Sequence, residues 1–361
     1  MRITFMLPSD NLTGGTRVVA VYARELQALG HEVLVVTCAA DAPNWRQRLK
    51  ASWGRRRSAP PAEGHVAQSG VPHQVMPRAG PIMAADVPDA DVIVATWWET
   101  AVWMDRFPAS KGRKVHLIQG YEIWFGSHYS ARVHAALKLP NLKIAISRDL
   151  KNTIEAALGP LAITVIPNAV DLEQFNAAPR RRNAAPVVGF VYATAAIKGA
   201  DICIEACALA RQQLPELRVI AFGADQPTAE LPLPKDAVFT HRPAQHALRD
   251  RYSECDAWLF GSRLDSFGLP MLEAMACRTP VIAVPIGAAE DLMAGGGGVL
   301  VPKESPMDMA NALVAMCTQP EAQWQQYSDH AYATAQRYSW HDATRRLIDA
   351  ISSAPGPKPL F

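Results

Sequence analysis

Short runs of consecutive apolar residues alternate along the chain with longer segments whose apolar residues recur at helical spacing. The runs fit strands buried on both faces of a parallel sheet, and the longer segments fit amphipathic helices. We expect strands at residues 3–7, 31–37, 91–96, 115–118, 143–146, 162–166, 187–192, 217–222, 237–241, 258–261 and 281–284. We expect helices at residues 17–29, 200–213, 248–255, 306–317 and 321–338, with others ending at residue 158 and beginning at residue 270. This alternation predicts an α/β fold built from strand–helix–strand units.

The stretch SRLDSFGLPMLEAMACRTPV at residues 262–281 holds the strongest candidate for chemistry. Gly268 makes a turn with little side-chain bulk, and Pro270 fits the first turn of the helix that follows. A glycine lets backbone N–H groups approach an anion closely, and a helix N-terminus adds partial positive charge. The turn therefore predicts a phosphate site.

Two carboxylates bracket this turn, Asp265 before it and Glu273 one helical turn inside. A carboxylate can accept hydrogen bonds from two neighbouring hydroxyls, such as those of a ribose or a hexose. A phosphate flanked by sugars describes a nucleotide sugar. The alternative is an ordinary strand–turn–helix unit in which Glu273 is simply solvated.

The run SFGLPMLEAMACRTPVIA resembles the signature of the retaining GT-B glycosyltransferases of family 4, in which two Glu residues are separated by seven others. Asp265 stands at the first position, so the carboxylate arm is one methylene shorter, and Glu273 stands at the second. The resemblance implies two Rossmann-like domains with parallel sheets that face each other across a cleft. Residues 1–168, completed by a helix at 340–353, would form the acceptor-side domain, and residues 169–339 would bind the nucleotide sugar. It also implies catalysis without a metal or other cofactor.

The same resemblance assigns roles to residues of the second domain. Glu273 would bind the ribose hydroxyls, Asp265 would approach the donor sugar, and the N–H groups of Gly268 and Leu269 would hold the diphosphate together with Lys198. Ser266 and Phe267 would complete this sugar-donor site, and Arg242 lies in the loop expected beside the base. The family's Arg near the Lys-Gly pair is missing, since Ala193 or Thr194 stands there. Arg263, or alternatively Arg148, is the expected substitute.

In the first domain, the resemblance implies that Gly14, Gly15 and Thr16 lie beside the sugar-donor diphosphate or the acceptor, although a mere tight turn is the alternative. Gln119 stands where many family members carry a His that contacts the donor sugar. Glu122 would bind or deprotonate the acceptor hydroxyl, or else make a structural hydrogen bond. The runs ATWWETA and HLIQGYEIWF resemble the rhamnan-synthesis type of bacterial family 4 enzyme.

Composition limits the possible classes of protein. The 361 residues suffice for two domains, and 49% hydrophobic with 19% charged residues fit a soluble globular enzyme. The net charge of +2 is too small to argue for nucleic acid. The six cysteines show no metal-binding spacing, which favours buried free thiols in a reducing cytoplasm. A basic segment containing tryptophans, at residues 45–57, could touch the inner face of the cell membrane or could be a solvated loop.

We therefore predict a cytoplasmic retaining glycosyltransferase for bacterial surface polysaccharide or glycoconjugate assembly. It would move a hexosyl or deoxyhexosyl group from a dTDP-, UDP- or GDP-linked sugar to a glycan or lipid-linked acceptor. Three alternatives remain open at this point. The protein could be a GT-B epimerase or phosphorylase, a non-catalytic nucleotide-sugar-binding subunit, or a structural two-domain protein with a decayed site.

Overall fold

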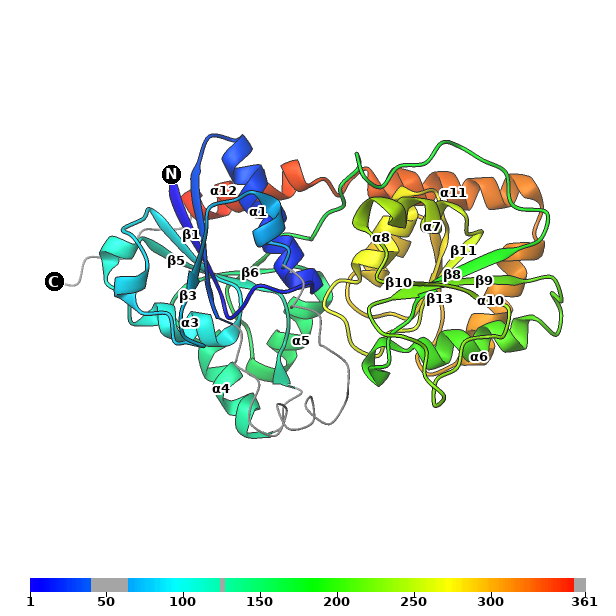
Figure 1. Cartoon of the computed structure of the whole chain (residues 1–361), viewed down its shortest axis with the longest axis horizontal. Helices are drawn as coiled ribbons and strands as arrows, with labels where there is room; N and C mark the ends of the chain where they lie inside the picture. Colours follow the sequence, from blue (N-terminus) through cyan, green and yellow to red (C-terminus); the bar gives the residue numbers. More distant parts are fainter. Residues whose placement is uncertain (40–63, 124–126, 354–361) are drawn as a thin grey trace, which may run out of the picture. The chain divides into compact units, whose positions relative to one another are not determined.

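The computed structural model describes residues 1–39, 64–123 and 127–353 (Figure 1). The chain forms two compact units. Unit 1 comprises Met1–Ile146, Lys151–Ile166 and the chain from Trp340, and unit 2 comprises Ser147–Leu150 and Pro167–Ser339. The basic segment 45–57, for which membrane contact and a solvated loop are the alternatives, lies outside the described residues.

Unit 1 contains a seven-stranded parallel sheet in the order β3-β2-β1-β4-β5-β6-β7. The strands are β1 (Arg2–Leu7), β2 (Glu32–Cys38), β3 (His73–Met76), β4 (Val92–Ala95), β5 (Arg113–Ile118), β6 (Leu142–Ala145) and β7 (Ile163–Val165). All four residues of β4 are buried, as expected for a central strand with helices on both faces. The strand β3 was not predicted, because it lies at the sheet edge and only Met76 of its four residues is buried.

Helices cover both faces of this sheet (Figure 1). They are α1 (Gly14–Ala28), α3 (Trp98–Asp105), α4 (Ser127–Leu137), α5 (Arg148–Leu158) and α12 (Trp340–Ser353), with the first three residues of α5 counted in unit 2. The last helix, α12, packs on α1, and α3 packs on α4. Trp340 meets Tyr22 of α1 edge to face, with 5.3 Å between the ring centroids. The end of the chain therefore completes the core begun by its first helix.

Unit 2 repeats this plan with a six-stranded parallel sheet in the order β10-β9-β8-β11-β12-β13. The strands are β8 (Val187–Val191), β9 (Arg218–Gly223), β10 (Val238–His241), β11 (Ala257–Phe260), β12 (Val281–Ala283) and β13 (Gly298–Leu300). The helices are α6 (Ala200–Ala210), α7 (Leu248–Ser253), α8 (Leu269–Ala276), α9 (Ala289–Met293), α10 (Pro306–Thr318) and α11 (Glu321–Ala335). The helix α6 packs on α10, while α8 packs on α7 and α11 (Figure 1).

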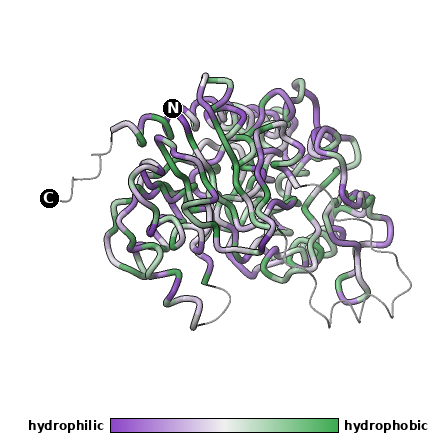
Figure 2. Tube along the Cα trace, turned by 60° about the vertical axis from the view of Figure 1, so that its left-hand side comes forward, coloured by the Kyte–Doolittle hydropathy of each residue, from purple (hydrophilic) through white to green (hydrophobic). Residues whose placement is uncertain are grey.

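The prediction of two Rossmann-like domains with parallel sheets is confirmed. Figure 2 shows hydrophobic stretches of the trace alternating with hydrophilic and mixed ones. The six cysteines are free and buried, as predicted. Within the part of the chain that the structure describes, no helix combines the length and apolar character needed to cross a bilayer.

Candidate functional site

The strand order of unit 2 brings two loops from distant parts of the sequence together. The strand β8 pairs with β9 on one side and with β11 on the other, so the winding of the sheet reverses between β8 and β11. Open parallel sheets bind ligands outside the carboxyl ends of their strands at such a reversal. The loop after β8 carries Lys198, and the loop after β11 carries Asp265. Both predicted residues therefore lie where this sheet is built to bind a ligand.

Backbone contacts join the two loops. The carbonyl oxygen of Ile197 accepts from the Arg263 N–H at 2.9 Å and from the Ser262 hydroxyl at 3.0 Å. Gly199 has φ +63°, and a Cβ at this position would lie 1.8 Å from the carbonyl oxygen of Gly261. Position 199 therefore requires glycine both for its left-handed conformation and for its close approach to the neighbouring loop.

A single carboxylate ties Lys198 to the glycine turn. Asp265 Oδ2 pairs with Lys198 Nζ at 2.8 Å, while its Oδ1 accepts from the N–H groups of Phe267 and Gly268 at 3.2 and 2.9 Å. Of these groups, Lys198 and the Gly268 N–H were predicted to hold a diphosphate together with the Leu269 N–H. In this structure Lys198 and the Gly268 N–H hold the carboxylate of Asp265 instead, which differs from the expectation that Asp265 turns toward sugar hydroxyls. Asp265 is thus an internal anion on a site suited to anions.

The rest of the turn is packed tightly. Gly268 has φ +86°, and a Cβ there would lie 2.4 Å from Met271 Cε. Phe267 is buried with its ring 6.5 Å from that of Tyr338, and the Ser266 carbonyl accepts from the Ser147 hydroxyl at 2.7 Å. Leu269 opens α8 as a half-buried residue. The conformation of the turn is consequently fixed by close packing and by a side-chain hydrogen bond.

Glu273 is 3% exposed on α8, and its Oε2 accepts from the Tyr252 hydroxyl of α7 at 2.6 Å. A buried carboxylate requires hydrogen-bond donors, because losing its water without compensation is costly. The expectation of a solvated Glu273 is therefore wrong. Sequence reasoning missed Tyr252 altogether, since no spacing pattern connects residues 21 positions apart on different helices.

The arginines of this unit that were singled out from the sequence have protein partners in this structure. Arg263 makes a two-pronged ion pair with Asp201 and a further one with Glu304 at 2.7 Å. The expectation that it replaces the missing diphosphate clamp does not fit this arrangement, because two carboxylates already hold the guanidinium. Arg148 pairs with Asp291 at 3.4 Å. Arg242 is exposed with φ +47°, and its Nε donates to the Ala224 carbonyl.

Unit 1 brings Gly15 and Gln119 together. Gly14 and Gly15 are the first residues of α1 instead of a loop before it, which corrects the predicted helix start. A Cβ on Gly15 would lie 3.5 Å from Oε1 of Gln119. That oxygen is buried, and among the described residues no hydrogen-bond donor reaches it. Thr16 is buried with its hydroxyl on Asn11, so it is a structural residue of this corner.

Glu122 is 3% exposed, and burial raises the pKa of its carboxyl group to about 8. The physical cause is desolvation, which disfavours the charged form. At neutral pH the side chain is therefore mostly a neutral acid, which is able to donate a hydrogen bond. A buried acid of this kind at the carboxyl end of β5 is typical of a functional site.

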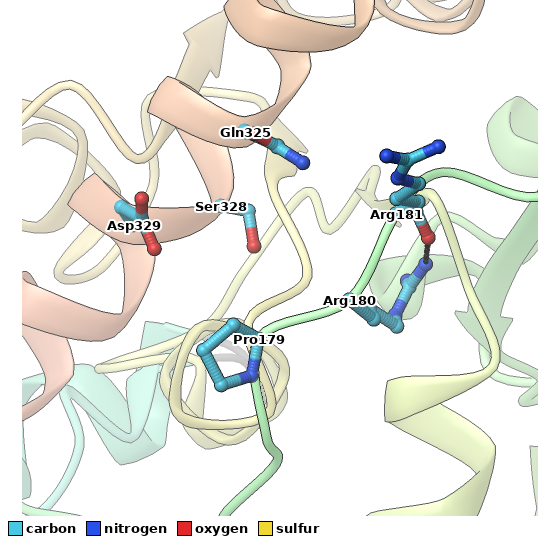
Figure 3. A pocket seen from close by; sticks show the side chains of 6 residues that line it. All are labelled: Pro179, Arg180, Arg181, Gln325, Ser328 and Asp329. Atoms are coloured by element: carbon cyan, nitrogen blue, oxygen red, sulfur yellow. Dashed lines mark hydrogen bonds between the residues drawn. The ribbon is translucent and has the colours of Figure 1, made fainter.

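Two other features, metal ligation and one hollow of unit 2, bear on the predicted site. Among the described residues, no group of three or more His, Cys, Asp or Glu side chains could hold a metal ion. A hollow of about 310 Å³ in unit 2 is lined by residues of the segment before β8 and of α11 (Figure 3). Its Arg180 donates to the Arg181 carbonyl and pairs with Asp256, so that guanidinium has structural partners. None of the residues predicted from the sequence lines this hollow.

Two family models match the chain, one over each half. Residues 12–174 match the model described as "Glycosyltransferase Family 4", and residues 185–319 match "Glycosyl transferases group 1". The structure superposes on HepE of Anabaena with a TM-score of 0.76 at 20% identity, covering 98% of this chain and 100% of HepE. Each half of the chain therefore matches a glycosyltransferase family model, and the fold is that of the GT-B glycosyltransferases.

Other glycosyltransferases resemble this chain in fold or in sequence. Sucrose-phosphate synthase of Thermosynechococcus elongatus shares the fold with a TM-score of 0.75 at 17% identity, covering 97% of this chain and 98% of the other. D-inositol 3-phosphate glycosyltransferase of Kribbella flavida is 32% identical over 243 residues, 58% of this chain and 57% of the relative. That of Stackebrandtia nassauensis is 31% identical over 220 residues, 54% and 49% of the two chains. The chain thus spans about half the length of the curated relatives it matches. HepE has been crystallised with UDP, with UDP and glucose, and with UDP-glucose.

Proposed function

We propose that this protein is a retaining glycosyltransferase that moves a sugar from a nucleotide diphosphate to a hydroxyl of a glycan or lipid-linked acceptor. The observation that carries the proposal is the meeting of Lys198 with the turn 265–268 at the winding reversal of the unit 2 sheet. The similarity to the glycosyltransferase family models, and a fold shared with a protein that binds UDP-glucose, support it.

In this proposal the diphosphate displaces the carboxylate of Asp265. The phosphate oxygens then accept from the Gly268 N–H and pair with Lys198, and the N-terminus of α8 adds partial positive charge. Asp265, released from these groups, turns toward the donor-sugar hydroxyls. Glu273 accepts from the ribose hydroxyls one helical turn further along α8.

The chemical step breaks the bond between the anomeric carbon and the diphosphate oxygen. Negative charge builds on the leaving diphosphate, and Lys198 stabilises that charge more in the transition state than in the ground state. The acceptor oxygen bonds to the anomeric carbon on the face that the diphosphate leaves, so the configuration is retained. The acceptor's proton passes to the departing diphosphate, which serves as the base.

Residues of unit 1 would contact the sugars, Gln119 that of the donor and Glu122 the acceptor. The unpartnered Oε1 of Gln119 is suited to a hydroxyl donor, because a buried acceptor without a partner gains free energy when a ligand supplies one. Glu122, neutral at pH 7, would donate a hydrogen bond to the acceptor instead of deprotonating it. This changes the expected role of Glu122 from base to hydrogen-bond donor.

The finer assignment follows the resemblance of residues 95–101 and 116–125 to rhamnan-synthesis enzymes. We infer a cytoplasmic role in bacterial surface polysaccharide or glycoconjugate assembly, with dTDP-, UDP- and GDP-linked sugars as the candidate substrates and residues 45–57 as a peripheral membrane contact. A non-catalytic nucleotide-sugar-binding subunit would bind the same ligands without transfer or hydrolysis.

The test is a thermal-shift screen of UDP, GDP, dTDP and their sugars, followed by calorimetry on Glu273→Ala. We expect one nucleotide class to stabilise the wild type and Glu273→Ala to lose that binding. Glu290→Ala, at an exposed carboxylate of the same unit, is the matched control and should bind as the wild type does. Unchanged nucleotide affinity in Glu273→Ala would show that the nucleotide does not bind at this turn of unit 2. Nucleotide-sugar binding by the wild type without sugar transfer or hydrolysis would favour the non-catalytic alternative.

A further inference from the structure

Tyr252 is a buried tyrosine whose hydroxyl donates a hydrogen bond to Glu273, a residue of the proposed nucleotide-sugar site. It lies on α7, is fully buried, and donates to Oε2 of Glu273 on α8 at 2.6 Å. The phenol supplies a donor to the carboxylate from a neighbouring helix. A carboxylate offers several lone pairs, so a hydrogen bond from the phenol is compatible with hydrogen bonds from ligand hydroxyls.

The ring of Tyr252 is held by aromatic neighbours. Its centroid lies 4.5 Å from that of Trp258, 5.5 Å from Phe222 and 5.9 Å from Phe175. Its carbonyl accepts from the Thr279 hydroxyl at 2.7 Å, which also fixes the backbone. An aromatic side chain has few rotatable bonds, so packing on this scale fixes where the hydroxyl points.

We propose that Tyr252 is a positioning residue that fixes the Glu273 carboxylate for a ribose carrying both hydroxyls. The inference rests on the proposed function, because it assumes that Glu273 receives the ribose. It narrows the substrate class to ribonucleoside diphosphate sugars. A site built to accept hydrogen bonds from two hydroxyls discriminates against a ligand that lacks one, since its buried acceptor then stays unpaired.

The experiment measures calorimetric affinities for UDP and 2′-deoxy-UDP, which differ only in the ribose 2′-hydroxyl. The variants are Tyr252→Phe, which removes only the phenol oxygen, and Glu273→Asp, which withdraws the carboxylate by one methylene from Tyr252. Tyr192→Phe is the matched control. Tyr192 is also fully buried in unit 2, but its hydroxyl donates to the Leu231 carbonyl at 2.7 Å.

We expect the wild type to prefer UDP over 2′-deoxy-UDP by about tenfold, a difference of one hydrogen bond to a charged group. Tyr252→Phe and Glu273→Asp should each lose most of this preference, mainly by weakening UDP binding. Tyr192→Phe should keep it, even where its thermal stability falls as far as that of Tyr252→Phe.

Equal wild-type affinities for the two nucleotides would overturn the inference, and so would an undiminished preference in Tyr252→Phe. Glu273→Asp tests only whether the carboxylate receives the ribose, so Tyr252→Phe decides the role of Tyr252. A wild type that binds no nucleotide at all would instead contradict the proposed function, which separates the two failures.

Discussion

Glu122 makes the stability of the protein depend on pH. Its folded pKa of about 8 exceeds its ordinary value of 4.5, so the folded state binds the proton more tightly than the unfolded state does. The protonated Glu122 carboxyl group therefore contributes stability to the folded state. This contribution is fully present below pH 4.5 and is lost as pH rises through 8. We expect the unfolding free energy of the wild type, minus that of Glu122→Gln, to fall by a few kcal/mol between about pH 5 and pH 9. Urea titrations across this range measure it. Glu32→Gln, at an exposed residue of the same unit, should show no such trend, and parallel profiles for the wild type and Glu122→Gln would contradict the prediction.

Asp265 should compete with the nucleotide diphosphate. Its ion pair with Lys198 is partly exposed, at 20% and 44% for the two side chains, so its contribution is limited to about 1 kcal/mol. Asp265→Asn should therefore tighten UDP binding by up to about fivefold in calorimetry, because the Lys198 ammonium is released. Asp236→Asn, which breaks a surface ion pair with Arg211 elsewhere in unit 2, is the control. Weaker UDP binding in Asp265→Asn would show that Asp265 assists the nucleotide.

Lys198 should matter more for turnover than for affinity. The charge that it stabilises grows as the glycosidic bond breaks, so Lys198→Ala is expected to lower kcat about 100-fold or more. Nucleotide affinity should change far less. Steady-state transfer and calorimetry with the sugar nucleotide identified by thermal shift separate the two effects. Lys303→Ala, at an exposed lysine of the same unit, should leave both unchanged, whereas wild-type turnover in Lys198→Ala would exclude Lys198 from the mechanism.

At the scale of elements, the contact between the loops after β8 and β11 has one vulnerable position. A methyl group at residue 199 would meet the Gly261 backbone at 1.8 Å and would also sit at a positive φ. Gly30 has φ +83°, and a Cβ added there would have no neighbour within 4 Å, so Gly30→Ala isolates the conformational strain. In urea unfolding, Gly30→Ala should cost about 1 kcal/mol, and Gly199→Ala should cost at least about 2 kcal/mol more. Equal losses would mean that the loops separate without penalty.

At the scale of the whole molecule, the C-terminal helix belongs energetically to the first unit. Trp340 is 8% exposed and packs on Tyr22, so Trp340→Ala should destabilise unit 1 by about 3–5 kcal/mol. Hydrogen exchange should then accelerate in α1 and leave α6 and α10 protected. Trp324→Ala, at a fully buried tryptophan of unit 2, should give the reverse pattern. Uniform loss of protection in both variants would show that the units unfold as one.

Local sequence patterns determined most of the fold. Buried parallel strands need apolar side chains on both faces. Runs such as those of β4, β8 and β11 can therefore be recognised as strands from the sequence alone. The exceptions have physical reasons. The edge strand β3 carries too few buried residues to show the pattern, and the glycines at the start of α1 suggested a loop because glycine is a poor helix former.

The candidate site also combines features that local sequence indicates with contacts that only the tertiary structure creates. The turn at Gly268 and its carboxylates Asp265 and Glu273 could be singled out from local sequence, because glycine, proline and charge at fixed spacing express a local geometry. Lys198 was singled out only through the resemblance to a family. The partners of these residues were not predictable. Asp265 meets Lys198 across 67 positions, and Tyr252 meets Glu273 on another helix. Only the order of the strands decides which loops and helices become neighbours, because contact between distant residues depends on how the sheet is wound and not on any spacing along the chain.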